Sequence, residues 1–335
     1  MTLPTRSIGP FTVSAVGLGC MNLSHAYGTK PAEADAARLL NTALDAGVTM
    51  LDTAALYGGG ANERLLGKAV MHRRREFTLA SKCVLDMVDG KRILDGSPAA
   101  ITRTLDAALQ RLGTDHIDLY YLHRLDPNVP IEDSVGALAD AKEAGKIDAI
   151  GLSEMSAATL RRAHAVHPIA AMQTEYSPWV RNAEIAVLDA CRELGTGFVA
   201  FSPLARGLLA GGITDNDFAA GDIRTSMPRF QSRNFAHNLT LAERFNAIAA
   251  DAGFTPAQLS LGWVLSRAPC VVPIPGTRSI GHLLENIAAA KIAVAASTVA
   301  QIDTLFAIEN IRGARYSAAV QQQIDTEIFP DEELA

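Results

Sequence analysis

Four side chains capable of acid–base chemistry occur in the order Asp52, Tyr57, Lys82 and His123. Three of them lie in or at the ends of short apolar runs, TMLDTA, FTLASK and IDLYYLH. Each run is typical of a buried strand with a polar residue near its C-terminal end. In a parallel barrel these ends share one mouth, where such enzymes build their sites. The spacing therefore predicts a reaction centre.

Together these side chains predict a proton donor. The pKa of a free tyrosine is about 10, and a nearby ammonium lowers it by favouring the phenolate. Lys82 can supply that charge, Asp52 can pair with Lys82, and His123 can hydrogen-bond a substrate oxygen. Such a group would act on a carbonyl or alkoxide oxygen.

Taken singly, each residue has an ordinary structural interpretation. Asp52 fits a helix cap or a turn, Tyr57 a packing residue, Lys82 a solvated charge and His123 a core histidine. Only their combination at the ends of successive strands favours catalysis.

The elements that would position these residues alternate along the 335-residue chain, which is long enough for one large barrel with insertions. Strand-like runs are predicted near residues 14–19, 49–54, 77–82, 117–123, 148–153, 170–175, 197–203 and 270–275. Helical periodicity covers residues 32–46, 63–71, 98–112, 131–144, 156–166, 183–194, 239–252 and 256–266, with more after residue 279. Eight strand–helix repeats predict an α/β fold, a (β/α)8 TIM barrel.

Three segments fall outside the repeats. TRSIGPFTVS predicts a hairpin that caps the bottom of the barrel. Residues 211–237 predict a mobile loop over the mouth, and residues 312–335 an extension that helps to wall the pocket. Because no linker or repeat marks a boundary, we expect a single domain over residues 1–335.

Composition and charge indicate which classes of partner the protein can bind. The chain is 48% hydrophobic and 20% charged with a net charge of −6, which gives no electrostatic footprint for nucleic acid and favours small molecules. No apolar stretch approaches the roughly 20 residues needed to span a bilayer. We expect a cytoplasmic protein with no membrane or metal partner and with reduced, scattered cysteines at Cys20, Cys83, Cys191 and Cys270.

Longer motifs resemble a known family. The runs GVTMLDTAALYGGGANERLLGKAV, LASK, DLYYLHRLDPNVPIEDSVGALADAKEAGKIDAIGLSE, MQTEYSPW, VAFSPLARGLL and VPIPGTRSIGHLLENIAAA look like the aldo-keto reductase superfamily over most of the chain. The segment HRLDPNVPIEDSV is similar to the branch of bacterial and plant reductases that includes perakine reductase.

This resemblance implies NADPH-dependent reduction of an aldehyde or ketone by an NADP-dependent oxidoreductase. Asp52, Tyr57, Lys82 and His123 match the catalytic tetrad of the family. There the tyrosine is the general acid, the lysine tunes its phenol, the aspartate holds the lysine, and the histidine orients the carbonyl.

The resemblance also implies cofactor contacts. Ser153 and Gln173 match contacts to the nicotinamide carboxamide, whereas Glu154 replaces a usual Asn and cannot donate as an amide does. Phe201 stands where a stacking Tyr is usual. The segment SPLARGLL would lie along the pyrophosphate, or form an ordinary strand-to-loop turn; its assigned residues are Ser202, Leu204, Arg206, Gly207 and Leu209.

A second anion site is expected where GTR follows the eighth strand and opens a helix. By resemblance it holds the ribose 2′-phosphate and favours NADPH over NADH, although an arginine solvated at a helix start would look the same. By the same resemblance, Thr277 and Arg278 of the segment that starts at Gly276 hold the phosphate, His282 lies at a position that is often basic, and Glu285 and Asn286 contact adenine.

Candidates for the substrate pocket are Tyr27, Arg124 and Trp179. Arg124 indicates an anionic or polar substrate unless it pairs with Asp126, and Trp179 fits the core or a lid equally well.

Other classes of protein stay in view. A Rossmann dehydrogenase needs GxGxxG, which the chain lacks after Gly19, and no Tyr–Lys pair of the short-chain type occurs. A cofactor-binding regulatory subunit like the potassium-channel β subunits would share barrel and tetrad, as would an alcohol or sugar dehydrogenase. The substrate, the stereochemistry and the oligomeric state, homo-oligomers included, are not predicted.

Overall fold

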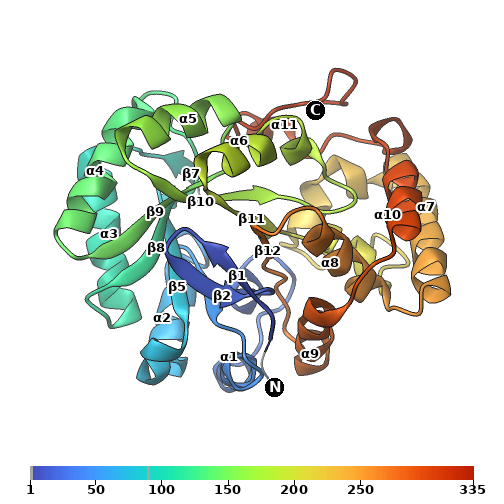
Figure 1. Ribbon diagram of the computed structural model, residues 1–335, viewed down its shortest axis with the longest axis horizontal. Helices are drawn as coiled ribbons and strands as arrows, with labels where there is room; N and C mark the ends of the chain where they lie inside the picture. Colours follow the sequence, from blue (N-terminus) through green and yellow to red (C-terminus); the bar gives the residue numbers. More distant parts are fainter. Residues whose placement is uncertain (1–2, 89–90) are drawn as a thin grey trace.

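The protein is described here by a computed structural model that covers residues 3–88 and 91–335. Eight parallel strands lie side by side in the order β12-β11-β10-β9-β8-β5-β4-β3, with helices packed around them (Figure 1). The strands are β3 (Leu18–Gly19), β4 (Met50–Asp52), β5 (Thr78–Cys83), β8 (Ile117–Leu122), β9 (Ile147–Ser153), β10 (Ile169–Glu175), β11 (Gly197–Phe201) and β12 (Val271–Pro273). All eight predicted strands are confirmed, and the (β/α)8 architecture with them.

The helices also follow the predicted pattern. They are α1 (Glu33–Asp45), α2 (Ala61–Ala69), α3 (Pro98–Leu112), α4 (Ile131–Glu143), α5 (Ala157–Val166), α6 (Val187–Leu194), α7 (Ser232–Asp251), α8 (Pro256–Ser266), α9 (Ile280–Ala288), α10 (Ala296–Leu305) and α11 (Ala318–Gln321). The caps of α3 explain why its ends could be predicted. The Ser97 side chain accepts from the backbone N–H of Ala100 in the first turn, and Gly113 ends the helix at φ 69°. The loop predicted to end at residue 237 is too long, because α7 already begins at Ser232.

The barrel closes through backbone contacts between its first and last strands. The N–H of Gly17 donates to the carbonyl of Pro273 at 3.0 Å, and that of Gly19 to the carbonyl of Pro275 at 3.3 Å. A Cβ on Gly19 would lie 2.7 Å from the carbonyl oxygen of Ile274. The close approach of the two strands therefore requires glycine.

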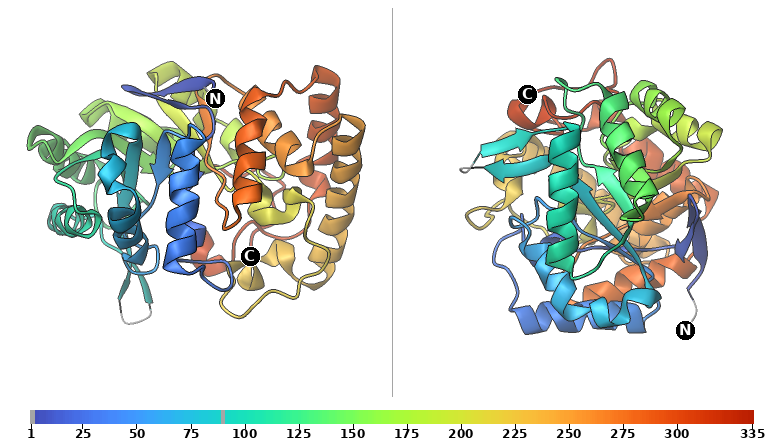
Figure 2. Two further views of the ribbon diagram at one scale, coloured as in Figure 1. Left: turned by 90° about the horizontal axis from the view of Figure 1, so that it is seen from below. Right: turned by 90° about the vertical axis from the view of Figure 1, so that its left-hand side faces the viewer.

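The predicted N-terminal hairpin is present as β1 (Thr5–Ile8) and β2 (Phe11–Ser14). Ile8 and Val13 are fully buried and extend the apolar filling of the barrel, which includes Met50, Leu119 and Tyr121. The hairpin thus caps the end of the barrel opposite the C-terminal ends of the strands (Figure 2).

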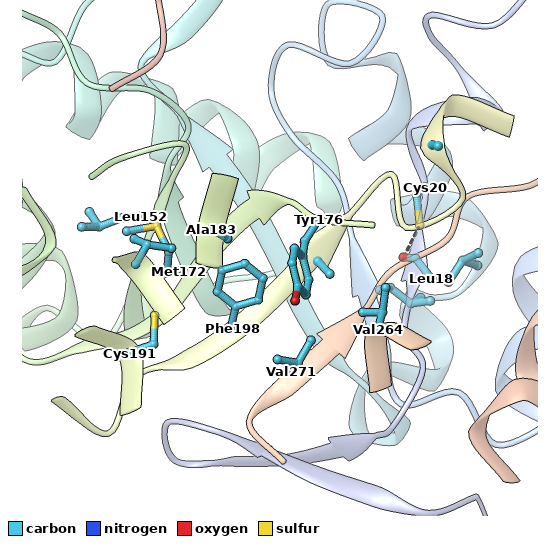
Figure 3. Packing of buried hydrophobic residues seen from close by; sticks show 14 of the residues in the cluster. Leu18, Cys20, Leu152, Met172, Tyr176, Ala183, Cys191, Phe198, Val264 and Val271 are labelled. Atoms are coloured by element: carbon cyan, nitrogen blue, oxygen red, sulfur yellow. Dashed lines mark hydrogen bonds between the residues drawn. The ribbon is translucent and has the colours of Figure 1, made fainter. Parts of the chain in front are cut away.

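A second core lies between the strands and the surrounding helices. Figure 3 shows Phe198 of β11 packed beside Tyr176 and Met172. The ring centroids of Phe198 and Tyr176 lie 5.6 Å apart. Large side chains on the outer face of the barrel fix the helices and so fix the loops that carry the site.

A hairpin that the sequence pattern did not predict follows β5. It consists of β6 (Leu85–Val88) and β7 (Lys91–Leu94), and it projects at the end where the C-terminal ends of the strands meet (Figure 2).

No helix among the described residues is long and apolar enough to cross a bilayer.

Replacement of Gly19 by alanine tests the closure of the barrel. We expect Gly19→Ala to lower the free energy of unfolding by about 1–3 kcal/mol, because the new methyl group meets backbone that cannot move aside. Urea or thermal unfolding measures this change.

The matched control is Gly136→Ala in α4, where the added Cβ has no neighbour within 4 Å. This change should be neutral or stabilise by up to about 1 kcal/mol. Equal stability of the Gly19 and Gly136 variants would contradict a tight seam.

Candidate active site

The four acid–base residues come from three neighbouring strands and one loop. Asp52 ends β4, Lys82 lies near the end of β5, and His123 directly follows β8. Tyr57 lies in the turn between β4 and α2. Because β4, β5 and β8 pair in parallel and in register, their C-terminal ends bring these side chains to one place.

Lys82 is the centre of this group. Its ammonium is fully buried, pairs with the carboxylate of Asp52, and donates to the carbonyl of Thr53 at 2.9 Å and to the Tyr57 hydroxyl at 3.4 Å. Gln173 Nε2 donates to the other carboxylate oxygen of Asp52 at 2.8 Å. Burial alone would lower the pKa of Lys82, but Asp52 and Tyr57 together raise it, so the ammonium stays charged.

Tyr57 keeps its proton at neutral pH. Burial raises its pKa, and Lys82 acts in the opposite direction without cancelling that effect, so the pKa lies above the ordinary value. The lowering of the Tyr57 pKa by Lys82 was predicted correctly, but the larger rise in that pKa caused by burial was overlooked. The phenol is thus a donor held in its protonated form.

His123 is a neutral imidazole. Its pKa lies well below the ordinary value because it is buried and because Arg124, Lys82 and Arg92 carry positive charge nearby. Its ring meets that of Tyr57 edge to face, with centroids 5.9 Å apart. Among the described residues Nδ1 has no hydrogen-bond partner. The two rings therefore form one polar corner.

This corner opens into a cleft of about 630 Å³. Most residues singled out from the sequence line the cleft, from this polar corner to the start of α9. They are Asp52, Tyr57, His123, Ser153, Gln173, Phe201, Ser202, Leu204, Arg206, Gly207, Gly276, Thr277, Arg278, His282, Glu285, Asn286, Tyr27 and Arg124.

Three of the residues singled out do not line the cleft. Lys82 lies behind Asp52 and Tyr57 and acts through them. Leu209 is fully buried in the core. Trp179 is buried against Phe230 and under a guanidinium group, so its placement in the substrate pocket is wrong and its core interpretation is correct.

Arg206 lines the cleft but is already engaged. Its guanidinium makes two hydrogen bonds to Glu175, at 3.0 and 2.8 Å, and lies over the Phe201 ring. Burial would raise the pKa of Glu175, yet Arg206 and Arg315 lower it to about 2. Glu154 points away from the cleft and accepts from Arg315 at 2.6 Å. The substitution of Asn by Glu154 thus has a structural reason.

The far end of the cleft lies at the N-terminus of α9. Thr277 Oγ1 accepts from the backbone of Ser279 at 3.1 Å, and Arg278 is exposed and donates to the carbonyl of Thr29. No carboxylate within the described ranges pairs with Arg278. Asn286 is buried, and its Oδ1 lacks a partner among the described residues.

Other parts of the wall were partly predicted. The extension contributes Tyr316, Ser317 and Val320 to the wall, as expected. The long loop also lines the cleft, through Ile223, Arg224, Ser226 and Met227. Their contact with the cleft is confirmed, and the mobility of the loop stays a prediction. Sequence analysis missed His25, Arg92 and Arg224. Proximity of His25 to Tyr27 could have indicated the first; nothing in the sequence pattern placed the other two.

Comparison with known proteins agrees with this geometry. The Aldo/keto reductase family matches residues 15–307. The Aldo-keto reductase yakc [NADP(+)] of Schizosaccharomyces pombe is 43% identical, with 98% of this chain and all of that protein covered.

Two solved structures share the fold at 26% identity. The glycerol dehydrogenase AKR11B4 from Gluconobacter oxydans has a TM-score of 0.83, with 98% of each chain covered. An aldo/keto reductase from Klebsiella pneumoniae in complex with NADP and acetate has a TM-score of 0.70, with 93% of this chain and 99% of that one covered. From its fold, the matching family over residues 15–307 and these relatives, the chain belongs to the aldo/keto reductase family.

Proposed function

We propose that this protein reduces an aldehyde or ketone to the corresponding alcohol with NADPH as the hydride donor. The observation that carries the proposal is the protonated Tyr57 hydroxyl, held 3.4 Å from the Lys82 ammonium beside a neutral His123 at one end of the cleft. Family membership and a relative named for NADP(+) support the choice of cofactor.

The cleft has features that fit a dinucleotide. The aromatic ring of Phe201 and the polar groups of Ser153 and Gln173 would hold the nicotinamide. Arg278 at the start of α9 would hold the 2′-phosphate, and the unpartnered Oδ1 of Asn286 would accept from adenine. We propose that the cofactor binds before the carbonyl compound, since it would occupy the length of the cleft.

The roles of the chain's own residues follow from their geometry. Bound NADPH supplies the hydride that adds to the carbonyl carbon. Tyr57 donates its hydroxyl proton to the carbonyl oxygen, and His123 hydrogen-bonds the same oxygen and fixes its direction. Lys82 orients the phenol and stabilises the phenolate that forms, while Asp52 keeps Lys82 in place.

The reverse reaction is a second candidate, because one structural relative is named as a glycerol dehydrogenase. Alcohol oxidation would use the same groups in the opposite direction. Rates of NADPH oxidation and NADP+ reduction under matched conditions distinguish the two. A regulatory role like that of the channel subunits would show cofactor binding without turnover.

We further propose that residues 1–335 work as one domain. The C-terminal segment is bonded to the barrel, for example through Asp325, which accepts from the Ser156 hydroxyl at 2.9 Å.

The first prediction concerns the proton donor. Tyr57→Phe should lower kcat for carbonyl reduction by about 10²–10⁴-fold, because only the acid is removed. The variant should still bind NADPH, and quenching of protein fluorescence measures that binding. Tyr120→Phe is the control, a buried tyrosine outside the cleft that should keep full activity. Full activity of the Tyr57 variant would exclude this role.

The second prediction concerns the cofactor phosphate. Arg278→Glu should raise the Kd for NADPH by about 10- to 100-fold and change that for NADH little, since only NADPH carries the 2′-phosphate. Arg75→Glu makes the same charge change at an exposed position outside the cleft and should alter neither value. An unchanged NADPH affinity in the Arg278 variant would refute the assignment.

The third prediction concerns pH. The pKa of His123 lies well below 6.5 and that of Tyr57 above 10.0. Between these values the donor stays protonated and the imidazole neutral, so kcat for reduction should be flat from pH 6.5 to 10.0. A pH–rate profile at saturating NADPH and substrate checks this, and a limb with a midpoint near pH 8 would contradict it.

A further inference from the structure

Two arginines lie in the cleft wall at its catalytic end, Arg92 and Arg124. Arg124 directly follows His123, and both guanidinium groups act electrostatically on the His123 ring. They lie away from Arg278, which is at the α9 end of the cleft. The charge at the catalytic end is therefore separate from the charge proposed for the cofactor phosphate.

Arg124 has an unused binding edge. Its side chain is buried, with 8% exposure, and Nη1 donates to the carbonyl of His123 at 2.6 Å and to Ser153 Oγ at 3.3 Å. Nε is buried without a partner among residues 3–88 and 91–335, and Nη2 makes no hydrogen bond there. These two atoms form the side of a guanidinium that gives parallel N–H groups to a carboxylate.

No carboxylate in the part of the chain that the structure describes fills this role. Asp126, the partner considered from the sequence, instead accepts from the backbone N–H groups of Gly96 and Asn128, each at 2.9 Å. Within the described ranges neither Arg92 nor Arg124 has an ion-pair partner.

Two other arginines of the wall differ in this respect. Arg206 pairs with Glu175 and Arg224 with Asp222, at 2.8 and 2.7 Å. The positive charges of Arg206 and Arg224 are thus neutralised by carboxylates, whereas among the described residues those of Arg92 and Arg124 are not.

Arg92 belongs to β7 of the β6–β7 hairpin. Leu85 and Leu94 are opposite each other in the hairpin and pack in a small cluster with Leu56 and Tyr57. Arg92 lies two residues before Leu94 and so shares its face, which is the face toward the cleft. The hairpin therefore holds this guanidinium over the site.

The two arginines also repel each other. Burial and the charge of Arg124 both lower the pKa of Arg92. An anion between them would relieve this repulsion and would satisfy the buried Nε of Arg124.

We propose that Arg92 and Arg124 bind a carboxylate of the substrate, and that the protein reduces aldehydes or ketones that carry a carboxylate group. A carboxylate is planar, and its two oxygens match the free edge of Arg124 while Arg92 neutralises the charge from the rim. This inference rests on the proposed function.

The experiment compares two aldehydes that differ in the charge of one group, a carboxylate and its methyl ester. We would measure kcat/KM with NADPH for 4-carboxybenzaldehyde and for methyl 4-formylbenzoate. The expected ratio is at least about tenfold in favour of the acid, as for a charge-assisted hydrogen bond pair. In Arg92→Gln and Arg124→Gln the ratio should fall by about 10- to 100-fold, through a higher KM for the acid.

The control variant is Arg38→Gln, which removes an exposed arginine of α1 outside the cleft and should leave the ratio unchanged. NADPH affinity is measured for every variant. A loss of NADPH binding in Arg124→Gln would overturn the assignment of Arg124 to substrate and give it to the cofactor.

The remaining outcomes separate this inference from the proposed function. Reduction of the ester with no preference for the acid would overturn the inference and leave the function intact. A larger kcat/KM for 4-formylphenyl phosphate than for the acid would overturn the carboxylate assignment. If neither aldehyde is reduced, the proposed function fails. Calorimetric binding of 4-(hydroxymethyl)benzoate to the NADP+-loaded protein, weakened in Arg92→Gln, would then still support the anion site.

Discussion

The site depends on the buried ion pair between Lys82 and Asp52. An ammonium taken out of water is costly unless its charge is compensated and its protons are bonded. Asp52 supplies the compensation, while Thr53 and Tyr57 accept the other hydrogen bonds. Loss of one partner would leave the other charge buried and unpaired, at a cost of about 3–5 kcal/mol. The ammonium group that bonds the Tyr57 phenol is therefore also a structural element of the barrel.

Periodicity predicted most of the architecture because the barrel repeats one local pattern. Each strand is an apolar run and each helix an amphipathic one, and short polar turns separate them. The β6–β7 hairpin was missed because it is short and follows β5 almost directly. The helical pattern expected after residue 279 is confirmed by α9, α10 and α11, although their boundaries were not predicted. The start of α7 was missed because its first turns read as polar.

The convergence of the candidate side chains was predictable where a side chain lies at the end of a strand. Asp52, Lys82 and His123 follow from the position of each in its run, and Tyr57 from the turn next to Asp52. The prediction that Trp179 and Leu209 line the cleft was wrong, since a sequence cannot say which side of a loop faces a cavity. Arg92 could not be predicted either, because its place depends on the packing of a hairpin against Tyr57. Membership of one branch of the family stays a prediction.

A second buried charge network joins the C-terminal segment to the barrel. Arg315 bonds Glu154 at the end of β9 and Glu175 at the end of β10, and the Tyr316 hydroxyl also bonds Glu175. Arg206 completes the network from the β11 loop. During synthesis the strand ends that carry the acid–base groups leave the ribosome long before Arg315. The last part of the cleft wall, which includes Tyr316, is therefore synthesised after every strand of the barrel.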